Sequence, residues 1–188
     1  MTLQLALDGA EKGRTLAEAM ALARAAREYT DVIEVGTSFV LRDGLAAVEQ
    51  FARAGFGVPI LADVKIMDCG AGLCAMACEA GADIVTVMAF AADKTIEGVA
   101  REAHARGRRV MADLLGAQDA AAAAQVAAVS AACSGMPLAV AGGIRESTAR
   151  ALCAAGAEWL IVGGAVCNAP DARAAAAAIR MAMQGKGL

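Results

Sequence analysis

Aromatic residues, histidine and positive net charge are all scarce in this sequence of 188 residues. Phe, Trp and Tyr together make up 3%, there is one His, and the formal net charge at pH 7 is −3. Without a positive balance, a large nucleic-acid-binding surface is not expected. The segment Met1 to Leu7 lacks the basic start and long apolar run of a signal peptide, so a cytoplasmic location is expected.

The six cysteines and one charge-free stretch do not change the expectation of a cytoplasmic protein. Most cysteines fall within apolar helical patterns, which favours a reduced protein over a disulfide framework. Cys69, Cys74 and Cys78 invite a metal site, but no His or fourth Cys is near, so core packing is favoured. The stretch Ala120–Ile144 is long enough to span a bilayer. It is mostly Ala, however, and Pro137 would break a helix, so no membrane span is expected.

Alanine is abundant, with 51 residues, and the apolar content of 59% excludes an intrinsically disordered chain. Short β-rich runs alternate with Ala-rich amphipathic stretches. Strands are predicted at Leu3–Leu7, Val32–Val35, Val58–Ala62, Ile84–Val87, Arg109–Leu114, Leu138–Ala141 and Trp159–Val162. Helices are predicted at Leu16–Glu28, Gly44–Ala54, Ala71–Ala80, Thr95–Ala105, Ala120–Ala132, Glu146–Ala155 and Ala172–Met183.

This strict β/α alternation is typical of parallel strands joined by crossover helices. Gly81 and Gly156 each follow a predicted helix, where a left-handed residue is needed before the next strand. We therefore predict a single α/β domain over residues 1–188, a TIM-type (β/α)₈ barrel of which only seven strands are readable. The long interval from Val110 to Leu138 contains one helix, so one βα unit is missing there.

Carboxylates and one lysine stand at the ends of the first three strands, where parallel β/α folds gather catalytic groups. Asp8 ends the first strand, and Glu34 is embedded in the apolar second strand, where burial is costly unless it is paired or binds a metal. Asp63 and Lys65 share one face of the third strand while it is extended, and Asp68 begins the following loop. Asp8, Glu34 and Asp63 offer the oxygen ligands that Mg²⁺ prefers, and Lys65 could stabilise an enediolate oxygen.

The alternative is that these groups are salt bridges that cap the strands. Asp113 also ends a predicted strand, although alone it is weak evidence. His104 lies on a charged helical face and is expected to be exposed, so it is a poor candidate for a catalytic acid.

Two glycine pairs close the last two predicted strands, Gly142-Gly143 and Gly163-Gly164. Paired glycines let backbone N–H groups approach an anion, and a following helix adds a favourable dipole. Loops after the last two strands of a barrel are a recurrent phosphate site. The pairs therefore predict phosphate binding, with tight packing as the alternative for either pair alone.

Four segments carry a resemblance to a known family: Leu5–Asp8, Ile33–Thr37, Ala62–Asp68 and Ala141–Ile144. They resemble the orotidine-monophosphate-decarboxylase-like barrel group, and within it the 3-hexulose-6-phosphate synthases. The similarity extends from Leu3 to about Met183, and its most specific element is Asp-x-Lys-x-x-Asp at residues 63–68. The related 3-keto-L-gulonate-6-phosphate decarboxylases share this element but more often have Ala where Met67 stands.

The resemblance implies an Mg²⁺-dependent aldol condensation of formaldehyde with D-ribulose 5-phosphate to D-arabino-3-hexulose 6-phosphate, through an enediolate. It assigns Glu34 and Asp63 to the metal, and Asp8, Lys65 and Asp68 to the catalytic cluster. It assigns the phosphate to Gly142, Gly143, Gly163 and Gly164. It also implies a homodimer in which Asp68 acts across the interface.

The sequence departs from the family between Asp113 and Leu138. Family members carry a sixth strand that ends near a histidine, followed by a loop that covers the substrate. Here the segment from Gln118 to Ala132 leads directly into the helix before Leu138, either through a true deletion or because residues are missing from the sequence. Two alternatives to the synthase follow: a 3-keto-L-gulonate-6-phosphate decarboxylase, or a catalytically impaired protein that binds a sugar phosphate.

Overall fold

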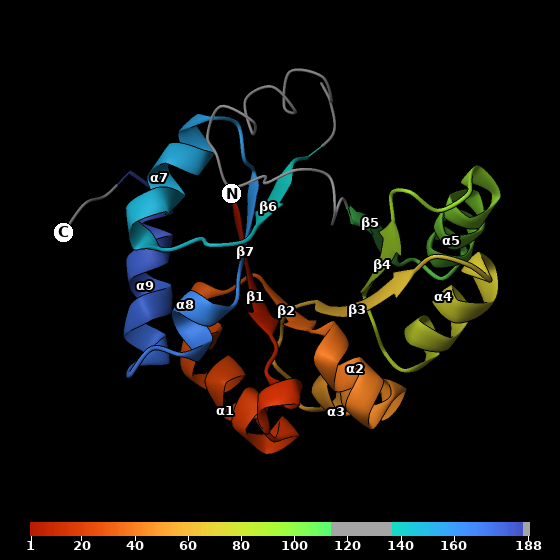
Figure 1. The fold of residues 1–188 in the computed structure, drawn as a ribbon, viewed down its shortest axis with the longest axis horizontal. Coiled ribbons are helices and arrows are strands. Elements are labelled where there is room, and N and C mark those ends of the chain that lie inside the picture. The colour runs from red at the N-terminus through yellow and green to blue at the C-terminus, as the bar shows by residue number, and fades with distance from the viewer. Residues whose placement is uncertain (114–136, 186–188) are drawn as a thin grey trace. The chain divides into compact units, whose positions relative to one another are not determined.

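The computed structural model describes residues 1–113 and 137–185, in which strands and helices alternate along the chain (Figure 1). The strands, rich in Val, Ile and Leu, are β1 Thr2–Leu7, β2 Val32–Val35, β3 Ile60–Ile66, β4 Ile84–Met88, β5 Arg109–Asp113, β6 Ala139–Ala141 and β7 Trp159–Val162. The longer helices are α1 Leu16–Ala26, α2 Thr37–Asp43, α3 Leu45–Arg53, α4 Gly70–Glu79, α5 Asp93–Ala105, α7 Glu146–Ala154 and α9 Ala172–Met183. Shorter helical turns are η1 Ala10–Lys12, η2 Arg27–Tyr29 and α8 Gly164–Cys167.

The strand pairs are parallel, as the alternation predicts. The strand order is β5-β4-β3-β2-β1-β7-β6. All seven predicted strands are present in the described residues, but β3 extends to Ile66, beyond the predicted end at Ala62. The helix predicted over Ala120–Ala132 and the missing βα unit fall in residues 114–136, outside the described part of the chain.

Two helices were not expected from the sequence. α2 starts directly after Gly36, in a segment for which no helix was predicted, and ends before Gly44. α8 is a single turn that follows Gly163. In addition, the predicted helix Leu16–Glu28 is α-helical only to Ala26 and continues as the 3₁₀ turn η2.

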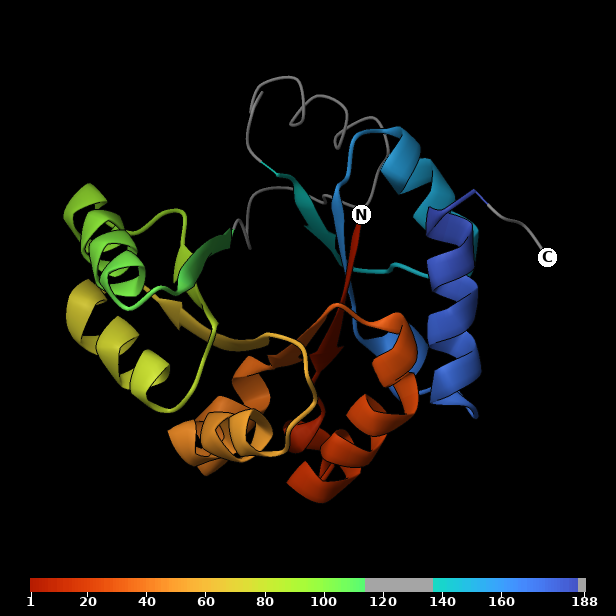
Figure 2. The ribbon, with the colours of Figure 1, turned by 180° about the vertical axis from the view of Figure 1, so that it is seen from behind.

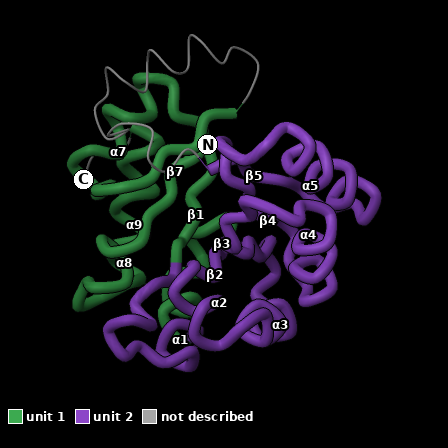
Figure 3. The backbone as a smooth tube through the Cα atoms, turned by 45° about the vertical axis from the view of Figure 1, so that its right-hand side comes forward, with its two compact units in different colours: residues 1–6, 21–32, 116–188 green, residues 7–20, 33–115 purple. Residues whose placement is uncertain are grey.

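Contacts between Cα atoms divide the chain into two compact units, which Figure 3 colours differently. The second unit comprises residues 7–20 and 33–115, and its core contains the fully buried Phe39, Phe51 and Ile84. In this unit α4 and α5 lie side by side (Figures 1 and 2). Their backbones approach so closely that a Cβ added at Gly70 would lie 2.3 Å from the Thr95 carbonyl oxygen.

The first unit comprises residues 1–6, 21–32 and 116–188. In it, β7 lies between β1 and β6, and α7 packs against α9 (Figure 2). Arg180 of α9 donates hydrogen bonds to the Tyr29 carbonyl oxygen and to Asp31, whose carboxylate also accepts from the Leu3 N–H. These bonds join the C-terminal helix to the start of β1. The single domain over residues 1–188 stays a prediction.

Cys74, Cys78 and His104 lie as expected from the sequence, whereas Cys69, which was also expected in the core, is exposed at the start of α4. Cys74 and Cys78 are buried where α4 meets α5, and the cysteines of the described residues are free thiols. His104 is exposed on α5. Over residues 1–113 and 137–185, no helix has the length and apolar character needed to cross a membrane.

Candidate active site

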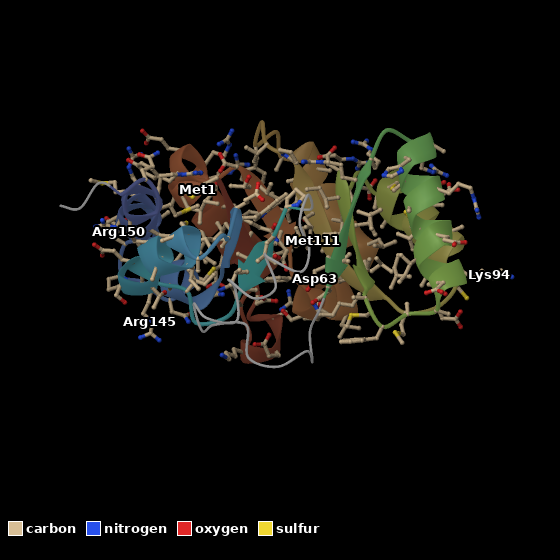
Figure 4. The ribbon with its side chains drawn as sticks, turned by 90° about the horizontal axis from the view of Figure 1, so that it is seen from above. Met1, Asp63, Lys94, Met111, Arg145 and Arg150 are labelled. Carbon is tan, nitrogen blue, oxygen red and sulfur yellow. The ribbon has the colours of Figure 1, made fainter. Side chains whose placement is uncertain are left out.

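A lysine between two carboxylates forms the centre of the candidate site, at the carboxyl ends of β3, β4 and β5 in the second unit. Lys65 Nζ lies 2.6 Å from Asp63 Oδ2 and 3.0 Å from Asp113 Oδ2. The Asp63 side chain is only 9% exposed, so its negative charge depends on these partners. Figure 4 shows Asp63 and Met111 among the strands, while Lys94 lies at the outer side on α5.

The backbone of β3 departs from a regular strand at this point. Ala62 pairs with Val85 and Ile66 pairs with Val87, so β3 advances by four residues over a stretch in which β4 advances by two. Lys65 has a φ of 47°, in the left-handed region that residues other than glycine seldom adopt. Asp63 and Lys65 are therefore brought together by an irregularity of the strand, and not by the shared face of an extended strand that we expected.

Two threonine hydroxyls complete the hydrogen bonding of Asp63. Thr86 Oγ1 on β4 donates to Asp63 Oδ1 at 3.0 Å and accepts from the Lys65 backbone N–H at 2.9 Å. Thr37 Oγ1, in the first turn of α2, lies 2.7 Å from Asp63 Oδ2. Neither threonine was expected in the site from the sequence. The sequence does carry one signal for Thr86, because its hydroxyl stands between the apolar residues Val85 and Val87 of a predicted strand.

The surroundings of Lys65 favour its charged form. Burial acts to lower the pKa of the ammonium, but the hydrogen bonds and negative charges of Asp63 and then Asp113 outweigh it. The pKa of Lys65 is consequently raised, and the side chain is a cation at neutral pH. In the free protein Lys65 can therefore stabilise negative charge, but it cannot act as a base.

Asp8 follows β1 and lies near the same charges. Its carboxylate is 3.4 Å from Ser38 Oγ, and a Cβ added at Gly36 would lie 2.1 Å from Asp8 Oδ1. The same Cβ would lie 2.6 Å from the Leu7 carbonyl oxygen, so the close approach of this backbone to the start of α2 requires glycine at position 36. Burial by protein atoms, followed by the charges of Asp63 and Glu11, raises the pKa of Asp8, although the side chain still reaches solvent.

Glu34 is buried within the sheet, whereas Asp68 is exposed in the loop between β3 and α4. Glu34 is buried on β2, paired in register with Leu61, so it faces the same side of the sheet as Asp63. Asp68 is exposed, and its Oδ1 accepts a hydrogen bond from the Cys69 N–H at the start of α4. The structure thus brings Asp8, Asp63 and Lys65 together with Asp113, while Asp68 bonds to its own loop.

The carboxylate oxygens of the site are ligands that Mg²⁺ prefers, but they do not form a complete coordination shell. Within the part of the chain that the structure describes, no group of three or more His, Cys, Asp or Glu side chains is placed to hold a metal ion. Mg²⁺, however, uses one or two carboxylates and keeps several waters. The two carboxylates predicted to hold the ion, Glu34 and Asp63, match that number.

The four predicted phosphate-loop glycines lie in the first unit. Gly142 and Gly143 follow β6 with φ values of 95° and 61°, and a Cβ at either position would meet nothing within 4 Å. Left-handed backbone, not tight packing, is therefore what requires glycine there. Gly163 and Gly164 lead from β7 into α8. Both pairs stand at the carboxyl end of a parallel strand, as predicted.

The model of the Orotidine 5'-phosphate decarboxylase / HUMPS family matches residues 1–134. A 3-hexulose-6-phosphate synthase of Staphylococcus saprophyticus is 32% identical over 214 residues, which cover 99% of this chain and 100% of the relative. Since 214 exceeds the 188 residues of the chain, the relative has positions without a counterpart here.

Solved structures agree with this fold. A crystal structure of 3-hexulose-6-phosphate synthase is 33% identical with a TM-score of 0.83, and the match covers 97% of this chain and 100% of that one. KGPDC from Streptococcus mutans is 21% identical with a TM-score of 0.86, over 98% of this chain and 97% of that chain, and so shows the fold alone. The predicted TIM-type β/α class is confirmed.

Proposed function

Because the chain belongs to the Orotidine 5'-phosphate decarboxylase / HUMPS family, we propose that it is an aldehyde-lyase of the 3-hexulose-6-phosphate synthase type. It condenses formaldehyde with D-ribulose 5-phosphate to D-arabino-3-hexulose 6-phosphate. Relatives with this name align with nearly the whole chain at about 32% identity. The observation that carries the proposal at the site is the ammonium of Lys65 held between Asp63 and Asp113.

The proposed chemistry begins with removal of a proton from C1 of ribulose 5-phosphate. Asp8 is the carboxylate suited to receive that proton, because its raised pKa makes it a stronger base than an ordinary aspartate. Lys65, charged at neutral pH, stabilises the negative charge on the enediolate oxygen. C1 of the enediolate then forms a bond to the formaldehyde carbon, and the formaldehyde oxygen takes up a proton.

Mg²⁺ belongs to the proposal as the cofactor, with Glu34 and Asp63 as the residues that would hold it. When bound, it would supply positive charge against the enediolate oxygens. The carboxylate oxygens suit this ion, and their number is the one that Mg²⁺ usually takes from a protein. Asp68 completes the proposed catalytic set.

The phosphate group of the substrate is proposed to bind at the glycine pairs, Gly142-Gly143 and Gly163-Gly164. Support comes from the consecutive left-handed glycines after β6, because such a backbone can turn successive N–H groups toward one anion. We further propose that the positions of the relatives without a counterpart here fall between Asp113 and Leu138.

A homodimer is the proposed assembly, in the cytoplasm. Large apolar side chains are exposed close to Asp68: Met67 is 53% exposed, and Leu73 and Met76 on α4 are 42% and 52% exposed. Phe90, after β4, is 56% exposed. Exposed apolar side chains gathered around adjacent segments favour a contact between protein chains. No nucleic-acid or membrane partner is proposed.

The test is a turnover assay with formaldehyde and ribulose 5-phosphate. We expect formaldehyde-dependent loss of ribulose 5-phosphate that is abolished by EDTA, restored by Mg²⁺, and lost in Asp63→Ala. Asp93→Ala, which removes an exposed aspartate in the first turn of α5, is the matched control and should retain activity. Absence of turnover in the wild-type protein would refute the synthase.

Two other functions give different results in the same experiment. Turnover of 3-keto-L-gulonate 6-phosphate without formaldehyde would identify a decarboxylase, an alternative that the Asp-x-Lys-x-x-Asp element at residues 63–68 leaves open. Heat of ribulose 5-phosphate binding without any turnover would identify a catalytically impaired sugar-phosphate-binding protein. The lack of a recognisable sixth-strand histidine favours this last candidate over the decarboxylase.

A further inference from the structure

The irregular conformation of β3 has to be held by contacts outside the strand. Between the pairs Ala62–Val85 and Ile66–Val87, three residues of β3 lie opposite one residue of β4, and Lys65 has a φ of 47° in the left-handed region. A residue with a Cβ pays a conformational cost there, and such a conformation persists only where neighbouring groups fix it. The position of the Lys65 ammonium therefore depends on whatever holds its backbone.

Thr86 is the side chain that contacts this backbone. It lies on β4, is only 4% exposed, and its Oγ1 accepts the Lys65 N–H at 2.9 Å. A hydroxyl has one hydrogen to donate. Because the Lys65 N–H is itself a donor, the Thr86 hydrogen is available for Asp63 Oδ1 at 3.0 Å.

These bonds close a ring between three residues. The Lys65 N–H donates to Thr86, Thr86 donates to Asp63, and Asp63 accepts from Lys65 Nζ at 2.6 Å. Both ends of the lysine, its backbone and its ammonium, are thereby fixed relative to one carboxylate. A valine in place of Thr86 would keep the shape of the side chain but would open the ring at two bonds.

We propose that Thr86 is a positioning residue, whose hydroxyl fixes the backbone of Lys65 and the carboxylate of Asp63 so that the ammonium and carboxylate keep their places in the site. Its effect on turnover rests on the proposed function. Its effect on Lys65 does not, because the accessibility of the ammonium can be measured in any folded sample.

The experiment compares Thr86→Val with Thr86→Ser, which restores the hydroxyl. Thr30→Val is the matched control, because Thr30 is similarly buried, at 3%, and its hydroxyl lies within hydrogen-bond distance of the carbonyl oxygens of Ala26 and Arg27, away from Asp63 and Lys65. The readouts are kcat and KM for ribulose 5-phosphate, and the rate at which an acylating reagent labels Lys65 by mass spectrometry. The exposed Lys94 serves as the internal reference for labelling.

We expect Thr86→Val to lower kcat by roughly 10- to 100-fold, the scale of a misplaced catalytic group. KM should change little, since the phosphate is proposed to bind elsewhere. Labelling of Lys65 relative to Lys94 should rise several-fold, and Thr86→Ser should return kcat and labelling toward wild type. If Thr86→Val does not fold, Thr86→Ala takes its place in the comparison with Thr86→Ser.

The proposal is overturned if Thr86→Val matches Thr30→Val in both kcat and Lys65 labelling. It is also overturned if Thr86→Ser behaves like Thr86→Val, because the hydroxyl would then not be the group that positions Lys65. An inactive wild-type protein would instead refute the synthase, and Lys65 labelling alone would decide the role of Thr86.

Discussion

Substitution of Gly36 by alanine tests the packing of α2 against the end of β1. The φ of Gly36 is −66°, which alanine adopts without strain, so any effect has to come from the added methyl group. That carbon would lie 2.1 Å from Asp8 Oδ1 and 2.6 Å from the Leu7 carbonyl oxygen. Asp8 can rotate away, but the Leu7 oxygen accepts the Gly36 N–H at 3.0 Å and cannot move without loss of that bond.

Overpacking of this kind costs about 1–3 kcal/mol, and a lost hydrogen bond adds about 1 kcal/mol. We therefore expect Gly36→Ala to lower the free energy of unfolding by about 2–4 kcal/mol, measured by urea denaturation. The control is Gly72→Ala in α4, where a Cβ meets nothing within 4 Å and alanine should stabilise the helix by about 0.5–1 kcal/mol. Equal stability of the two variants would refute the reasoning.

Two further substitutions test the charges of the site. In wild type, the stability that Lys65 gains from its raised pKa is present below about pH 10.4, the ordinary pKa of lysine, and is lost as pH rises through the higher folded value. Lys65→Met should therefore be less stable than wild type at pH 7, and the difference between their free energies of unfolding should shrink above about pH 10.4. A difference in denaturation midpoint that does not change with pH would contradict this expectation. The raised pKa of Asp8 means that its charge costs stability at pH 7, so Asp8→Asn should be more stable there yet inactive, with the gain fading as pH falls toward about 4. A destabilised Asp8→Asn at pH 7 would show that favourable contacts of the carboxylate outweigh its burial.

Periodicity predicted most of the fold because each strand and helix is decided by its own residues. β2 and β7 have the predicted bounds, and Gly81 and Gly156 adopt the left-handed φ values of 97° and 110° expected after a helix. Helix α2 was missed because its segment is short and follows Gly36 without a loop. Its position is set by packing against other parts of the second unit, which the local sequence does not encode.

The candidate site was only partly predictable, for the same reason. Asp8, Asp63 and Lys65 are visible as charged residues at strand ends. Thr86 is 23 positions from Asp63, and its role depends on the register of β3 and β4 and on an irregularity between them. A regular register, which is the only one that periodicity can supply, would have given Lys65 an extended backbone.

The proposed Mg²⁺ can be compared with the arrangement of charges at the site. Among the described residues, the carboxylates of Asp8, Asp63 and Asp113 outnumber the ammonium of Lys65, so these four side chains together carry excess negative charge. Repulsion from Asp63 contributes to the raised pKa of Asp8, which means that a proton on Asp8 relieves part of this excess. A divalent cation would relieve it as well, and would leave Asp8 free to take a proton from substrate. The negative balance therefore supports the proposed Mg²⁺ and the proposed proton acceptor Asp8 as two parts of one proposed mechanism.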